Sequence, residues 1–139
     1  MSDTTAEIEA FFAEFADASR AEEWERFEHL FLPTFLSLDP TTAAPVERQA
    51  LIAFLPRRRE LFERVGASGT RLATLEITDL DAIHALARTT WSVVYERPHD
   101  PVTLRSTFTL RRTDDGWRIA VYLNHESLLE LLGLSAPRE

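Results

Sequence analysis

Residues 102–125 read VTLRSTFTLRRTDDGWRIAVYLNH, and polar and apolar residues alternate on both sides of a central turn. This period of two is typical of strands with one buried face. The dipeptide Asp115-Gly116 is a hairpin turn signal. The first run has one face made of Leu104, Ser106, Phe108 and Leu110. In the second run, strict alternation predicts that one face carries Trp117, Ile119, Val121, Leu123 and His125.

The same period extends upstream. Residues 71–79 and 83–96 alternate, and the Pro-rich segment 97–101 separates the second of these runs from residue 102. A short strand is predicted at 34–39, ending at Asp39-Pro40. We therefore expect a four-stranded antiparallel meander that an early strand can join.

Helical spacing dominates the first third of the chain. Ile8, Phe11, Phe12 and Phe15 follow at i, i+3, i+4 and i+7, which predicts one apolar helix face. A second apolar stripe begins at Trp24 and is predicted to end before Pro33. After a predicted loop at 40–45, a third helix is expected from Val46, with a kink or break at Pro56.

These elements predict an α+β fold in one domain, residues 1–139, with 127–139 as a C-terminal tail or short helix. A curved sheet with one apolar face must cover that face, and the three N-terminal helices are available to cover it. The prediction is a half-cone with a pocket between the helices and the concave sheet face.

Composition excludes several classes of chemistry. All 15 basic residues are arginine, so there is no lysine for Schiff-base chemistry or a Walker loop, and there is no cysteine. The net charge of −8 argues against a nucleic-acid partner. No apolar run is long enough for a membrane span, and the N-terminus lacks a signal-peptide pattern. We expect a cytoplasmic protein with no cofactor.

The order of elements resembles the nuclear transport factor 2-like superfamily, which includes SnoaL-like polyketide cyclases and ketosteroid isomerases. The resemblance covers residues 5–126 and depends on the aromatic first helix, Ser37-Leu38-Asp39-Pro40, the helix from Val46 and the closing hairpin at 115–119. It implies a cystatin-like half-cone, often homodimeric through the sheet, with an internal ligand pocket.

The similarity to the isomerases is partial. Asp39 falls at the position of their general base. Their oxyanion hole uses a tyrosine and an aspartate, and counting along this chain places Phe15 and Ser106 at those positions. Loss of one oxyanion donor costs about 100- to 1000-fold in rate. Steroid isomerisation is therefore not expected.

Two residues are candidates for acid–base catalysis. Asp39, near apolar neighbours, is suited to accept a proton, and the alternative is an aspartate that holds the Asp-Pro turn. His125 is expected near the pocket mouth, and the alternative is a half-exposed histidine at a strand end. Glu25 and His29 have metal-ligand spacing, but no third ligand follows, so no metal site is expected.

The predicted ligand pocket is built from both halves of the chain. Its expected lining residues are Phe12, Phe15, Thr89, Trp91, Tyr95, Ser106, Phe108 and Val121. The alternative for the aromatic residues is plain core packing. The opposite sheet face is predicted to carry arginine, threonine and tyrosine, a composition that suits a homodimer or a solvated face.

We therefore expect a SnoaL-like protein that binds a small apolar molecule. If it is an enzyme, cofactor-free isomerisation, cyclisation or dehydration of a carbonyl compound fits the residues best, as an isomerase, cyclase or lyase. The alternative is a non-catalytic ligand-binding or dimerisation module.

Overall fold

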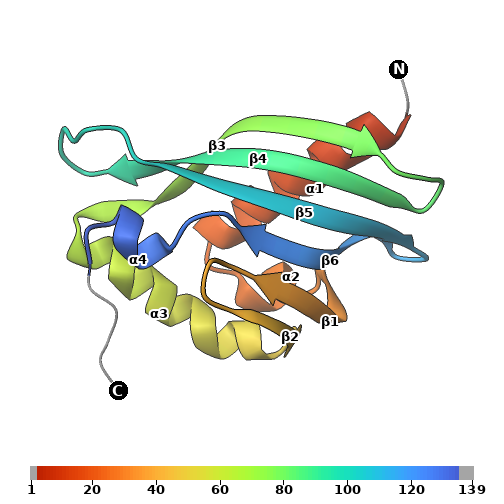
Figure 1. The fold of residues 1–139 in the computed structure, drawn as a ribbon, viewed down its shortest axis with the longest axis horizontal. Helices are drawn as coiled ribbons and strands as arrows, with labels where there is room; N and C mark the ends of the chain where they lie inside the picture. Colours follow the sequence, from red (N-terminus) through yellow and green to blue (C-terminus); the bar gives the residue numbers. More distant parts are fainter. Residues whose placement is uncertain (1–2, 135–139) are drawn as a thin grey trace.

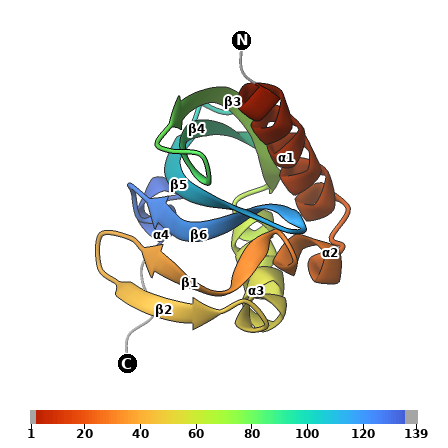
Figure 2. The same ribbon diagram turned by 90° about the vertical axis from the view of Figure 1, so that its right-hand side faces the viewer.

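A curved, open sheet of six strands carries the helices on its concave side, as the computed structural model of residues 3–134 shows (Figures 1 and 2). The strand order is β2-β1-β6-β5-β4-β3, and every neighbouring pair is antiparallel except β1 and β6. The elements are α1 (Asp3–Arg20), α2 (Trp24–Glu28), β1 (Phe31–Leu38), β2 (Ala43–Glu47), α3 (Ala50–Arg64), β3 (Ala67–Asp79), β4 (His84–Tyr95), β5 (Thr103–Thr113), β6 (Gly116–Asn124) and α4 (Leu128–Leu131). The predicted α+β half-cone is confirmed.

Helix α1 is held on the sheet by its aromatic stripe. Ile8 and Phe12 are fully buried, and the Phe12 ring lies 5.0 Å from the ring of Phe108 on β5. The Phe15 ring lies 5.6 Å from Trp91 on β4. Burying rings of this size supplies much of the hydrophobic stabilisation of a small domain. The predicted helix face is therefore the one that covers the sheet.

Ion pairs fix the two ends of α1. Arg112 on β5 donates to both carboxylate oxygens of Glu7, at 3.0 and 3.1 Å, and these hydrogen bonds lower the pKa of Glu7. At the other end, Arg26 on α2 binds Glu14 and Asp17, and its hydrogen bonds lower the pKa of both carboxyls. These contacts set how α1 and α2 lie over the sheet.

The segment before α3 differs from the prediction. Residues 43–47 form β2, an edge strand that pairs with β1, and Val46 is opposite Phe35. Pro45 is tolerated there because an edge strand leaves one side of its ladder unpaired. The helix predicted from Val46 therefore begins at Ala50. A kink or break was predicted at Pro56, and the helix continues through this residue, so there is no break.

Strand β6 does not alternate strictly. Leu110 pairs with Ile119, but the next pair is Thr109 with Val121, so Ala120 is an extra residue in a β-bulge. Trp117 and Ile119 are buried before the bulge, as predicted.

After the bulge, the inward and outward positions are exchanged. Tyr122 is opposite Phe108 and Asn124 is opposite Ser106, so these two side chains face inward. The prediction that Val121, Leu123 and His125 share the face of Ile119 is wrong, because one inserted residue moves all later side chains to the other face.

The chain continues after β6 into a short helix. Part of the predicted tail forms α4, and Leu132 just after it is buried. Residues 135–139 of the predicted tail lie outside the described residues. None of the helices in the described part of the chain is long and apolar enough to cross a membrane.

Candidate functional site

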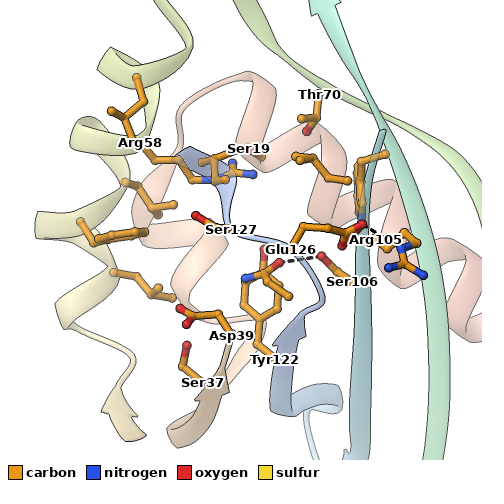
Figure 3. A pocket seen from close by; sticks show the side chains of 18 of the residues that line it. Ser19, Ser37, Asp39, Arg58, Thr70, Arg105, Ser106, Tyr122, Glu126 and Ser127 are labelled. Carbon is orange, nitrogen blue, oxygen red and sulfur yellow. Dashed lines mark hydrogen bonds and ion pairs between the residues drawn. The ribbon is translucent and has the colours of Figure 1, made fainter. Parts of the chain in front are cut away.

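A cavity of about 560 Å³ lies between α3, the β1–β2 hairpin, the strands β5 and β6, and α4 (Figure 3). Its apolar lining residues are Phe15, Ala16, Phe27, Phe35, Val46, Ala50, Leu51, Phe54, Leu55, Leu61, Trp91, Leu104, Leu128, Leu129 and Leu131. Its polar lining residues are Ser19, Ser37, Asp39, Thr41, Arg58, Thr70, Arg105, Ser106, Tyr122, Asn124, Glu126 and Ser127. Mostly apolar walls with a few polar groups are typical of small-molecule sites.

Asp39 lies at the hairpin end of the cavity and also holds the turn. Its Oδ1 accepts hydrogen bonds from the backbone N–H groups of Thr41 and Thr42, both at 2.8 Å, and from Thr41 Oγ1 at 3.1 Å. Its Oδ2 receives no hydrogen bond from residues 3–134. The turn-holding alternative therefore has direct geometric support, and one oxygen is left for another partner.

Thr89 and Ser106, the two predicted polar residues of the sheet, belong to a chain of hydrogen bonds that runs from Trp91 to Asn124. Trp91 Nε1 donates to Thr89 Oγ1 at 2.8 Å, and Thr89 Oγ1 donates to the Ser106 carbonyl at 2.8 Å. Ser106 Oγ donates to Asn124 Oδ1 at 2.7 Å. Because Thr89 and Ser106 are nearly fully buried and bonded inside the protein, this chain orients the cavity wall.

Glu126 and Tyr122 bring polar groups to the cavity that were not predicted from the sequence. Glu126 Oε1 accepts a 2.7 Å hydrogen bond from Arg105 Nε, while Glu126 Oε2 is buried with no hydrogen-bond partner among the described residues. The Tyr122 ring stacks on Phe108, with 4.8 Å between the ring centres. The bulge at Ala120 turns Tyr122 and Asn124 inward. A strictly alternating strand would place both side chains on the outer face, so the sequence pattern does not reveal them.

Several predicted site residues lie elsewhere. His125 is exposed on the outer sheet face, where its Nε2 lies 2.7 Å from Thr107 Oγ1, so it is not brought together with Asp39. Val121 is also on that face. Phe12 and Phe108 are fully buried core residues, and Tyr95 stacks on His99 at 3.7 Å. Of the predicted pocket residues, Phe15, Trp91 and Ser106 line the cavity.

The polar side chains of the lining can exchange protons or form hydrogen bonds. Within residues 3–134, no three histidine, aspartate or glutamate side chains gather in a way that would hold a metal ion.

The chain belongs to the NTF2-like family. The family model described as NTF2-like protein (DUF6841) matches residues 4–127, which include the sheet, the three N-terminal helices and most of the cavity. No curated protein matches the sequence.

Solved structures share the fold at low sequence identity. An NTF2-like protein with a cystatin-like fold from Novosphingobium aromaticivorans is 19% identical with a TM-score of 0.71, over 88% of this chain and 80% of that one. A ketosteroid isomerase-like protein from Erwinia carotovora atroseptica is 17% identical with a TM-score of 0.66, over 90% and 97%. The beta subunit of benzoate 1,2-dioxygenase from Burkholderia mallei is 16% identical with a TM-score of 0.65, over 88% and 89%. At these identities the likeness shows the fold alone, and the fold hosts several activities.

The bonding of Asp39 predicts a specific stability pattern. D39A removes the acceptor for two backbone N–H groups and should lower the free energy of unfolding by about 1 kcal/mol. D39N keeps an acceptor oxygen and should lose less than half as much. Urea denaturation of the two variants measures both values, and equal losses would contradict the turn-holding role.

Proposed function

We propose that this protein binds a small, largely apolar molecule in the cavity beneath α3. The observation that carries the proposal is the cavity itself, because its volume of about 560 Å³ is not filled by the protein's own aromatic side chains. Small-molecule sites usually enclose about 300–1,000 Å³. The alternative, in which the aromatic side chains fill the half-cone as plain core packing, leaves no such space.

The walls support an apolar ligand with a few polar groups. Phenylalanine and leucine side chains come from α1, α2, α3 and α4, so the ligand would be enclosed from several sides. Hydrogen bonds link Thr89 to Ser106 and Ser106 to Asn124, so the two lining side chains are already oriented, which lowers the cost of ordering the site on binding.

A filled cavity should abolish binding. Ser37 points into the cavity (Figure 3), and S37W would place an indole in the space of the ligand. The neutral fluorescent probe N-phenyl-1-naphthylamine should bind the natural protein and bind S37W at least about tenfold more weakly. A fluorescence titration gives both dissociation constants.

The matched control is the next residue along β1. Leu36 is 38% exposed and pairs with Val121, on the outer face of the sheet. L36W should bind the probe as the natural protein does. The proposal fails if the natural protein does not bind the probe, or if S37W and L36W bind it equally well.

Cofactor-free acid–base catalysis on a carbonyl compound is the second candidate function. The free Oδ2 of Asp39 at the cavity supports a proton-accepting role for this residue. His125 lies on the outer sheet face, so its side chain cannot act as the acid–base partner of Asp39. Non-catalytic binding is therefore the function that the geometry favours.

We also propose a homodimer through the outer sheet face. The bulge places Val121 and Leu123 on this face beside Thr107 and Thr109, so it is more apolar than strict alternation predicts. Central interface positions are typically poor in charge and rich in apolar contact.

A charge on this face should separate the two copies. L123E would bury an unpaired carboxylate in the interface, which costs several kcal/mol. Light scattering coupled to gel filtration should give a dimer mass for the natural protein and a monomer mass for L123E. The control L80E changes a residue in the β3–β4 turn and should stay dimeric. A monomer mass for the natural protein would contradict the proposal.

A further inference from the structure

Arg58 brings a positive charge to the cavity with no negative partner beside it. The charged lining residues are Asp39, Arg58, Arg105 and Glu126. Arg105 and Glu126 bind each other, and Asp39 accepts three hydrogen bonds in its turn. The Arg58 guanidinium carbon lies 5.0 Å from the centre of the Phe62 ring, and within residues 3–134 the side chain makes no hydrogen bond or ion pair.

The neighbouring arginines show that this arrangement is particular to position 58. Arg59 donates a hydrogen bond to Glu22 at 2.8 Å and forms an ion pair with Glu63 at 2.9 Å, so these two carboxylates are already occupied. Arg57 is exposed and lines neither cavity. Arg58 is partly buried, and Figure 3 shows its guanidinium directed into the cavity. A guanidinium offers five N–H donors and accepts nothing, so its unmet capacity is for an acceptor.

Hydroxyl groups from two other elements accompany Arg58. A second cavity of about 600 Å³ lies between α1, α3 and β3. Five residues line both cavities and so mark the place where the cavities meet, and the polar ones among them are Arg58, Ser19 and Thr70, beside Ala16 and Leu55. The guanidinium and the two hydroxyls together form a set of donors on α3, α1 and β3.

We propose that Arg58 binds an oxyanion of the ligand, so that the ligand is an apolar acid rather than a neutral molecule. This inference rests on the proposed binding function. The planar guanidinium fork fits a carboxylate or a similar oxyanion through two parallel hydrogen bonds. Ser19 and Thr70 supply further donors, and the apolar walls hold the remainder of the ligand.

Two probes that differ by one charged group test the inference. Anilinonaphthalene-1-sulfonate carries a sulfonate on the same ring skeleton as neutral N-phenyl-1-naphthylamine. R58M keeps much of the apolar stem and removes the charge, so it should weaken sulfonate-probe binding about tenfold or more and leave the neutral probe within about twofold. R57M, one residue away and outside both cavities, should leave both affinities within about twofold.

Further variants test whether the loss of binding comes from misfolding and whether the probes bind in the cavity or elsewhere on the surface. R58Q should reproduce the loss seen with R58M, and both variants should keep the thermal midpoint of the natural protein within a few degrees. S37W should lose both probes if they share the cavity. Equal weakening of the two probes by R58M, an unchanged sulfonate affinity, or an equal loss in R57M would each overturn the role of Arg58.

Different results would contradict the cavity-binding function and the oxyanion site at Arg58. If the natural protein does not bind the neutral probe, the cavity-binding function fails and the inference fails with it. If it binds the neutral probe in a manner sensitive to S37W but R58M does not discriminate between the probes, the cavity-binding function stands and the oxyanion site is wrong.

Discussion

The inserted residue Ala120 in β6 determines where the hydrophobic core ends and the cavity begins. Before it, Trp117 and Ile119 are packed against the helices. After it, Tyr122 and Asn124 take the inward positions, and their polar groups become part of a wall. A bulge also bends and twists its strand, and β6 belongs to a curved sheet (Figure 2). One register change therefore joins a dry aromatic core to a partly polar cavity.

Much of the fold follows from periodicity, because helix α1 and strands β3 to β6 are long enough for their apolar spacing to decide the element, even where a bulge interrupts a strand. Strand β2 could not be found in this way. Its five residues include Pro45, and its pairing with β1 depends on a contact that local propensity does not encode. The turn held by Asp39 brings the two strands together, and it displaces the start of α3 from Val46 to Ala50.

The site was predicted less completely than the fold. Phe15, Trp91 and Ser106 were found because they lie before any irregularity in their elements. Residues after the bulge were assigned to the wrong face, so His125 was selected and Tyr122 was missed. Position 58 lies in a run of three arginines, and sequence alone does not distinguish the cavity-facing arginine from those that bind glutamate or water. Only the packing of α3 on β3 and α2 separates them.

The most direct test is to measure which of residues 121–124 a ligand in the cavity protects from chemical modification. The chain has no cysteine, so each of V121C, Y122C, L123C and N124C would carry the sole thiol. The rate of iodoacetamide modification is measured with and without saturating N-phenyl-1-naphthylamine. Because Tyr122 and Asn124 line the cavity, the probe should slow modification at 122 and 124 and leave the rates at 121 and 123 unchanged. Protection at 121 and 123 instead would contradict both the bulge and the cavity that depends on it.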